Sequence, residues 1–434
     1  MPADVLWEEV MKTAVNLSLA EARGAPCNRD LLLKWQGTER GRATRALHKL
    51  QGLAAPYWPK KLGELNPEAG SGHIAELMRR HRPKLPILKE GKEGPSYDEG
   101  VLKTYIDEDK DTHGICRATL DLRSISKGLS TYIEGPLGRV RQGIDEVWRL
   151  YWEFNIARAR TMRNSSSNPN SQNWPRLYRE CIISRHPHGI IQQSDGSQLE
   201  PRVMAHRAKC KRMLELFNDE KGRSIYLLVG QDLFGKVLDK RLDAELYLFV
   251  KTVVLATNYG ASLWTLMRKV KEDGLSIDED TMKRAFTKYQ KQYHEIFSFI
   301  DKTKRLVIKN QQITCMTGFV RHLPNGGSNS KGFWHIANEA VNVDIQHTAS
   351  WLALMWTNIV EEIIADEKIK VELLTQVHDS NVHDVPNKSE GKKLQAASEW
   401  AIQNLPVSAL IGEDLAVPLK CETGSGPNWR VASA

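Results

Sequence analysis

Two acidic stretches far apart in the sequence carry residue types that suit divalent-cation chemistry. Asp195 follows an apolar, β-prone run at 189–191, and Gly196 beside it leaves room for a ligand to approach the backbone. Asp379 stands between two apolar runs, and the pattern over 371–385 predicts a hairpin with this carboxylate in its tight turn. Two carboxylates on neighbouring strand ends can share two Mg²⁺ ions, which activate an attacking hydroxyl and neutralise a leaving pyrophosphate.

Asp195 alone also has a simpler explanation. Pro201 opens a helical pattern that continues through Val203, Met204 and the pair at 213–214. An Asp just before a helix is commonly an N-terminal cap or a turn residue. The second carboxylate stretch shifts the balance towards a shared metal site.

Both stretches resemble known motifs. SDGSQLEPRVMAH at 194–206 is similar to motif A, and QVHDSNVHDVP at 376–386 is similar to motif C, of the family A (DNA polymerase I-like) DNA polymerases. Further blocks resemble this family, in the family's order, along essentially the whole chain. The chain is therefore identified as a phage-type member that comprises the polymerase region only. The resemblance implies an α+β, right-hand polymerase fold with an antiparallel-sheet palm and a largely helical thumb and fingers.

The resemblance also assigns a catalytic metal site. Asp195 and Asp379 would hold two Mg²⁺ ions, with Mn²⁺ as a substitute, and the backbone carbonyl of Gly196 would complete the ligands of one ion. Motif C usually has a second acid where this chain has Ser380, so no third metal carboxylate is assigned. His378, which precedes the motif C aspartate, is expected against the primer end.

A third block, LDAELYLFVKTVVLATNYG at 242–260, predicts a helix that ends at its last glycine. Tyr247, Lys251, Leu255 and Tyr259 follow one another at steps of four and therefore lie along one side of this helix. The block resembles motif B, in which Lys251 would meet the phosphates of the incoming nucleotide and Tyr259 would pack near the templating base. A core aromatic at a helix end is the alternative explanation for Tyr259.

The chain departs from the family pattern around this helix. Tyr247 stands where an Arg is usual, so a second phosphate ligand would have to come from Lys240 or Arg241. Leu255 stands where Phe or Tyr is common, and it is assigned to the nucleotide site together with the motif B lysine. Tyr226, before the helix, replaces a frequent His.

Glu200 in motif A stands where DNA polymerases place a side chain that blocks a ribose 2′-OH, and Gln198 is assigned to the same nucleotide site. The tripeptides at 195–197 and 378–380 resemble the motifs of single-subunit, phage-type RNA polymerases at least as well as those of family A DNA polymerases. Such an RNA polymerase is therefore the nearest alternative. Glu200 and a chain too short for a promoter-binding domain favour a DNA polymerase. A third alternative is an inactive DNA-binding replication factor, against which the two aspartates and Lys251 argue.

The polar block TMRNSSSNPNSQNWP at 161–175 cannot form a core element, and its end resembles the family pattern PN-x-QN-x-P. A replicative polymerase must accept every base pair, so it should read the minor groove, where the acceptors of all pairs are nearly alike. Amide and guanidinium donors suit that task, and a simple Asx-turn loop is the alternative. The residues assigned to DNA contact are Arg163, Asn170, Gln172 and Asn173 in this block, and Lys127, Asn342, Gln346 and His378 elsewhere.

The composition agrees with a nucleic-acid-binding enzyme. The 434 residues include 61 Lys and Arg against 53 Asp and Glu, which gives a net charge of +8 that is spread along the chain. The six cysteines form no CxxC pair, which indicates neither a zinc site nor a disulfide framework but reduced thiols. No signal peptide and no apolar run of spanning length is present. The predicted location is the cytoplasm of a bacterial cell or a phage-infected host.

The predicted function is template-directed, primer-dependent DNA synthesis. Primer–template DNA and dNTPs are the expected partners, together with a separate exonuclease or other replication protein and no membrane. The family-like blocks begin near the start of the sequence, so no 3′→5′ exonuclease domain is expected in this chain. The predicted domains are an N-terminal helical segment at the base of the palm (1–60), the thumb (61–165), palm with motif A (166–205), fingers with motif B (206–312) and palm with motif C (313–434).

Overall fold

The computed structural model describes residues 3–67, 72–91, 94–108, 110–111, 113–159, 161–219, 223–324 and 330–433. The chain forms two compact units. The first unit comprises Met1–Ala25, Glu153–Asn173 and Ile183–Ala434, and the second comprises Pro26–Trp152 and Trp174–Ile182. Within the described ranges, none of the helices combines the length and the apolar character that crossing a bilayer requires.

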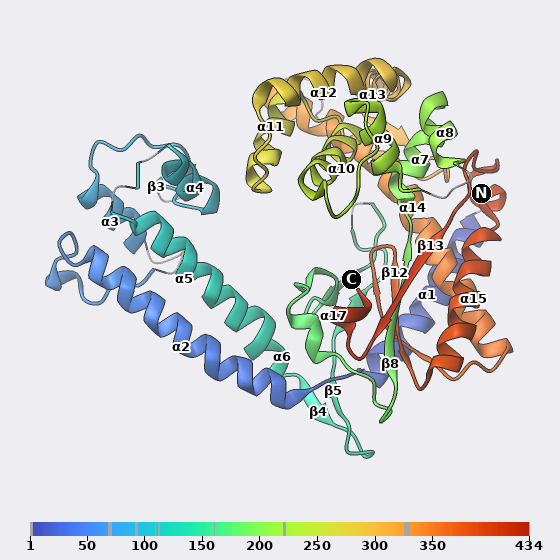
Figure 1. Ribbon diagram of the computed structural model, residues 1–434, viewed down its shortest axis with the longest axis horizontal. Helices are drawn as coiled ribbons and strands as arrows, with labels where there is room; N and C mark the ends of the chain where they lie inside the picture. The colour runs from blue at the N-terminus through green and yellow to red at the C-terminus, as the bar shows by residue number, and fades with distance from the viewer. Residues whose placement is uncertain are drawn as a thin grey trace. The chain divides into compact units, whose positions relative to one another are not determined.

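A four-stranded antiparallel sheet organises the first unit. Its strand order is β11 (Glu372–Val377), β12 (Ser380–Val385), β8 (Ile190–Gly196) and β13 (Cys421–Gly426). Helix α15 (Lys388–Gln403) packs against β8, β12 and β13 (Figure 1). The sheet therefore brings together strands whose sequences lie more than 180 residues apart, as the pairing of Ser380 with Asp195 shows.

The other elements of the first unit are mostly helices. Its helices are α1 (Ala3–Arg23), α7 (Leu199–Arg207), α8 (Lys211–Phe217), α9 (Ile225–Phe234), α10 (Ala244–Asn258), α11 (Leu263–Glu272), α12 (Glu279–Gln292), α13 (His294–Asn310), α14 (Ser330–Asp366), α16 (Val407–Ile411), α17 (Trp429–Ala432) and the 3₁₀ turn η3 (Ser171–Asn173). Its short strands are β6 (Glu153–Asn155), β7 (Ser165–Ser167), β9 (Gln312–Thr314) and β10 (Val320–His322).

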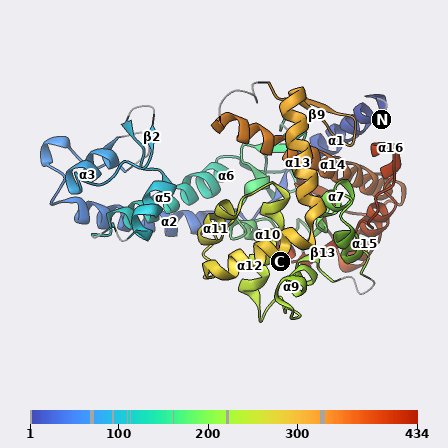
Figure 2. The same cartoon turned by 90° about the horizontal axis from the view of Figure 1, so that it is seen from above.

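The helices α7 to α13 share one hydrophobic core with α14 and α15. In α10 the residues Phe249, Val250, Val253 and Val254 are fully buried, because apolar side chains recur there at helical spacing. The helix ends before Gly260, whose φ of +72° places it in the left-handed region that closes helices. Figure 2 shows α10, α12 and α13 as one helical group.

The short helix α17 closes on the sheet through two glycines of β13. A Cβ atom on Gly424 would lie 2.2 Å from the carbonyl oxygen of Ala432, and one on Gly426 would lie 2.5 Å from Val431 Cγ1. The backbone of α17 can therefore approach β13 only because these two positions have no side chain. Trp429 of α17 adds a hydrogen bond from its Nε1 to Gln193 Oε1 of β8, at 2.8 Å.

The second unit has its own hydrophobic core. Helices α2 and α5 pack along each other, and apolar side chains of α3 and α4 complete the core between them. Its elements are α2 (Arg29–Ala54), η1 (Lys60–Leu62), α3 (His73–His81), β2 (Glu90–Gly91), β3 (Gly94–Pro95), α4 (Glu99–Asp107), α5 (Ile115–Leu129), the π-helical turn η2 (Ser130–Glu134), α6 (Gly135–Leu137), β4 (Val140–Gln142), β5 (Trp148–Leu150) and η4 (Tyr178–Cys181). Strand β1 (Ala25–Pro26) spans the boundary between the units.

The predicted α+β class with an antiparallel sheet is confirmed. The predicted helix after Pro201 is shorter than expected, because α7 ends at Arg207 and α8 begins at Lys211. Lys209 between them has a φ of +51°, which a helix cannot accommodate. The second compact unit begins at Pro26, because α2 packs with α5 in its core. The predicted division into thumb, palm and fingers stays a prediction.

Candidate active site

The candidate site lies where β8 ends beside the β11–β12 turn. Asp195 is the next-to-last residue of β8, and strand pairing sets Ser380 directly opposite it. The backbone N–H of Gly196 donates to the carbonyl oxygen of Asp379 at 2.8 Å, which fixes the turn against the end of β8. A Cβ on Gly196 would lie 2.9 Å from Leu199 Cδ1. Backbone pairing alone therefore brings the two predicted catalytic aspartates together.

The charges of the two aspartates are not fully compensated by the protein. Burial and the nearby charge of Asp195 raise the pKa of Asp379, while the positive charges of Arg163 and Lys251 lower it. Ser380 Oγ donates a hydrogen bond to Asp195 Oδ2 at 2.5 Å. The serine at the position of the usual second acid therefore serves the first aspartate as a hydrogen-bond donor.

These groups fit a divalent cation in chemistry and placement. Two neighbouring carboxylates, one of which raises the pKa of the other, are together with a backbone carbonyl the kind of oxygen ligands that Mg²⁺ takes. No group of three or more His, Cys, Asp and Glu side chains is placed to hold a metal ion in the part of the chain that the structure describes. Asp195, Asp379 and the carbonyl of Gly196 stay predicted ligands.

Arg163 and Glu200 form an ion pair beside the aspartates. Both side chains are largely covered, with 28% and 19% of their surfaces exposed. Arg163 is predicted to contact DNA and Glu200 is predicted to select the sugar, so the structure joins two residues that the sequence assigned to separate tasks. Because a charge-assisted bond between covered groups is directional, Arg163 fixes the carboxylate of Glu200.

The two tyrosines that depart from the family pattern, Tyr226 and Tyr247, contact each other. The rings of Tyr226 and Tyr247 meet edge to face, with centroids 6.0 Å apart and an interplanar angle of 89°. Lys251 Nζ lies 6.0 Å from the centroid of the Tyr226 ring, and Lys240 Nζ lies 5.9 Å from that of Tyr247. Burial, and secondarily the charges of Tyr247 and Asp379, raise the pKa of Tyr226. Two lysines therefore flank an aromatic pair at the edge of the site.

The remaining predicted nucleotide residues lie at element ends or on α10. Gln198 precedes α7 with a φ of +58°, and its Nε2 donates to Ser224 Oγ at 3.4 Å. Leu255 and Tyr259 are half-buried, and Tyr259 caps the C-terminal end of α10. These positions leave part of each side chain accessible.

The polar block packs on β11 through Ser171 and Gln172. The hydroxyl groups of Ser171 and Thr375 lie 3.0 Å apart, and Gln172 Nε2 donates to the carbonyl oxygen of Gln376 at 3.2 Å. Gln172 is only 7% exposed, so in this form its amide binds the sheet. Its predicted DNA contact stays a prediction.

Asn170 forms the Asx turn that was weighed as the alternative to a DNA contact. Its Oδ1 accepts hydrogen bonds from the backbone N–H groups of Gln172 at 3.0 Å and Asn173 at 3.2 Å. Both Asn170 and Asn173 are exposed, so their amide groups remain accessible. The Asx turn therefore does not exclude a further contact with a ligand.

The other predicted DNA residues are spread over three elements. Asn342 and Gln346 lie half-buried on α14, and the buried Oδ1 of Asn342 has no hydrogen-bond partner within the described residues. His378 is exposed in the β11–β12 turn with a φ of +56°. Lys127 is exposed on α5 in the second unit.

Glu422 is a carboxylate near the site that sequence reasoning missed. It lies opposite Asp195 on β13, as Ser380 does on β12, so the three side chains leave the same face of the sheet. The strand at 421–426 is short and rich in glycine, and nothing in it indicates a partner more than 220 residues earlier. The Tyr226–Tyr247 contact was also unforeseen, although both residues stood out as departures.

Comparisons with known proteins agree with this arrangement. A family model described as DNA polymerase family A matches residues 64–431. DNA polymerase I of Bacillus subtilis is 28% identical over 98% of this chain and 46% of its own length, and the thermostable DNA polymerase I of Thermus aquaticus is 27% identical over 83% and 42%. The chain thus spans less than half the length of these relatives.

A solved structure has the same fold. The polymerase domain of Pol1 from M. smegmatis, in complex with a DNA primer-template and dNTP, matches with a TM-score of 0.81 and 23% identity. The match covers 98% of this chain and 70% of the other. Since a family model spans most of the chain and this fold agrees with it, the chain belongs to the family A DNA polymerases.

Proposed function

We propose that this chain is a primer-dependent, template-directed DNA polymerase. The observation that carries the proposal is the position of Asp379 beside Asp195, near the charges of Arg163 and Lys251. Strand pairing of Ser380 with Asp195 and the bond from the Gly196 N–H to the Asp379 carbonyl fix this position. Family membership and the primer–template and dNTP in the M. smegmatis complex support it. The phage-type character, the cytoplasmic location and a separate exonuclease or other protein partner stay predictions.

In the proposed reaction the primer 3′-hydroxyl loses its proton to water and its oxygen bonds to the α-phosphorus of a dNTP. The bond from this phosphorus to the oxygen that bridges to the β-phosphate breaks, and pyrophosphate leaves. Two Mg²⁺ ions, held by Asp195, Asp379 and the carbonyl of Gly196, would lower the pKa of the primer hydroxyl and neutralise the leaving group when bound. Lys251 would hold the triphosphate as a point charge. Glu200, fixed by Arg163, would exclude a 2′-OH.

We also propose a domain assignment for the two units. The second unit would serve as the thumb, with α2 included, because α2 and α5 share one core. The sheet of the first unit would form the palm, and α9 to α13 would form the fingers. Lys127 on α5 would then contact the duplex backbone as a phosphate ligand.

Primer extension tests the proposal. A primed template with dNTPs should be extended by one nucleotide at a time, whereas rNTPs and an unprimed template should give little product. Efficient unprimed synthesis from rNTPs would favour the RNA polymerase alternative. DNA binding without extension in either Mg²⁺ or Mn²⁺ would favour the inactive replication factor.

A further inference from the structure

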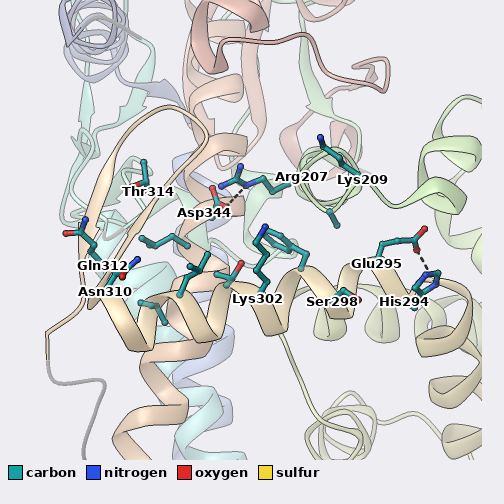
Figure 3. A pocket seen from close by; sticks show the side chains of 16 residues that line it. Arg207, Lys209, His294, Glu295, Ser298, Lys302, Asn310, Gln312, Thr314 and Asp344 are labelled. Carbon is teal, nitrogen blue, oxygen red and sulfur yellow. Dashed lines mark hydrogen bonds and ion pairs between the residues drawn. The ribbon is translucent and has the colours of Figure 1, made fainter.

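A groove of about 780 Å³ lies in the first unit, away from the residues assigned to catalysis. It is bounded by the length of α13, the C-terminal end of α7, strand β9 and Asp344 of α14 (Figure 3). Asp344 lies two positions from each of Asn342 and Gln346 on α14. The lining of the groove includes none of the residues assigned to catalysis, nucleotide binding or DNA contact.

Positive charge gathers in the middle of this groove. Lys302 extends from α13 towards α7, and Arg207 extends from the end of α7 to Asp344 (Figure 3). Lys209, which follows α7, is also among the residues that line the groove. The buried Asp344 is already engaged, because its Oδ2 accepts from Arg207 Nε at 2.8 Å and its Oδ1 accepts from the backbone N–H of Met316 at 3.2 Å. Within the described residues neither lysine forms an ion pair, so an added carboxylate would be favoured here.

The walls around these charges are apolar. Phe299 and Ile313 are half-buried, and Leu306 exposes 48% of its surface, although other apolar residues of α13 such as Val307 are buried in the core. An apolar surface in a groove with a cationic centre suits a ligand that carries both acidic and apolar groups.

The dimensions and the charge distribution favour a peptide over single-stranded DNA. The α13 helix has 17 residues and is therefore about 25 Å long, which an extended peptide of about seven residues would span. Glu295 and His294 line one end, and the uncharged Asn310 and Gln312 line the other. A nucleic-acid strand carries a negative charge at every phosphate, so only the middle of the groove would match it.

We propose that this groove binds an extended acidic segment of a partner protein. Acidic side chains of the segment meet Arg207, Lys209 and Lys302, and its apolar side chains cover Phe299, Leu306 and Ile313. The proposal does not depend on the proposed polymerase activity, because peptide binding is measured without primer extension.

The test uses a fluorescein-labelled heptapeptide, Leu-Asp-Asp-Leu-Asp-Asp-Leu, titrated with the full chain and followed by fluorescence anisotropy. The double variant Lys209→Glu with Lys302→Glu should bind it about tenfold more weakly, because each reversal turns an attraction into a repulsion. The matched double variant Arg305→Glu with Lys309→Glu reverses two exposed charges of α13 outside the groove and should bind it like the wild type.

The apolar part is tested in the same way. Leu306→Ser should weaken binding severalfold, whereas Val320→Ser, at an exposed apolar residue outside the groove, should not. Peptides with Asn for Asp, or with Ser for Leu, should also bind weakly. Equal binding of these peptides, no saturable binding, or equal losses in the two double variants would overturn the proposal. Displacement of the peptide by dTTP or oligo-dT, lost in the Lys209→Glu and Lys302→Glu variant, would identify a nucleotide site instead.

Discussion

Asp195 and Asp379 show how much of the proposed chemistry depends on single side chains. Asp195 lies at the end of β8 and Asp379 in the β11–β12 turn beside it, and burial together with the charge of Asp195 raises the pKa of Asp379. The charges of Arg163 and Lys251 offset this repulsion only in part. Divalent cations would relieve the remainder and would at the same time supply the charge that phosphoryl transfer requires.

Asp195→Ala or Asp379→Ala should lower the rate of primer extension by several orders of magnitude, since metal binding and positioning supply most phosphoryl-transfer catalysis. Primer–template binding, measured by anisotropy of a labelled duplex, should be retained. Asp366→Ala, at an exposed carboxylate at the end of α14, is the control and should extend normally. Near wild-type extension in either catalytic variant would refute the assignment.

The Arg163–Glu200 pair makes a prediction about sugar choice. Glu200→Ala should raise kcat/KM for rNTPs relative to dNTPs, because a 2′-OH would no longer be excluded. Arg163→Ala should shift the same ratio in the same direction, because Glu200 would lose the partner that fixes it. The double variant should shift the ratio no further than Glu200→Ala alone. Additive shifts would mean that the two residues act independently.

At the scale of elements, the sequence pattern predicts those helices and strands whose formation depends on neighbouring residues. The β11–β12 hairpin and helix α10 follow from apolar periodicity and from turn residues, and the structure places them within a few residues of the predicted bounds. The break between α7 and α8 could not be predicted. Lys209 adopts the left-handed backbone conformation that ends the helix, but the usual sequence signal for that conformation is Gly or Asn, and neither stands at this position.

The contacts that define the site could not be predicted, because their partners are distant in sequence. The Ser380–Asp195 bond joins residues 185 positions apart, and Gln172 binds the carbonyl of Gln376 across 204. The periodicity of apolar residues in a single sequence does not indicate which distant residues will pair. The family resemblance supplied the roles of the aspartates, but it could not show that Gln172 is held by β11.

Helix α10 carries the third prediction, at the Tyr247 departure. A bidentate Arg binds phosphate more strongly than a phenol does, so Tyr247→Arg should lower KM for dNTPs in steady-state extension. Tyr247→Phe keeps the ring that meets Tyr226 and should leave KM unchanged. A higher KM for Tyr247→Arg would mean that the aromatic contact matters more, and that another cation such as Lys240 already serves the triphosphate.

At the scale of the whole molecule, the core shared by α7 to α15 in the first unit and the core of the second unit have no residue in common. Leu102 is completely buried in the core of the second unit, and Leu266 is completely buried in that of the first. Each core is completed by segments that are distant in sequence, since the first unit contains both ends of the chain. Such an arrangement predicts that the units can lose stability separately.

Leu102→Ala and Leu266→Ala form a matched pair for this prediction. Each should lower the free energy of unfolding of its own unit by about 2–5 kcal/mol, through lost burial and a residual cavity. Hydrogen exchange followed by mass spectrometry should show faster exchange in residues 26–152 for the first variant and in residues 183–434 for the second. Equal acceleration throughout the chain in both variants would show that it unfolds as a single cooperative unit.

Helix α7 spans only Leu199–Arg207. Glu200, which is proposed to select the sugar, lies in its first turn, and Arg207 at its other end lines the groove proposed to bind an acidic peptide. If α7 moves as a rigid body, a ligand that shifts one of its ends also shifts the other. Thermodynamic linkage makes such an effect reciprocal: if a bound peptide changes the affinity for dNTP by some factor, dNTP must change the affinity for the peptide by the same factor. Peptide binding in the groove would then depend on the dNTP concentration, and a partner protein would bind with a different affinity when the polymerase holds a nucleotide.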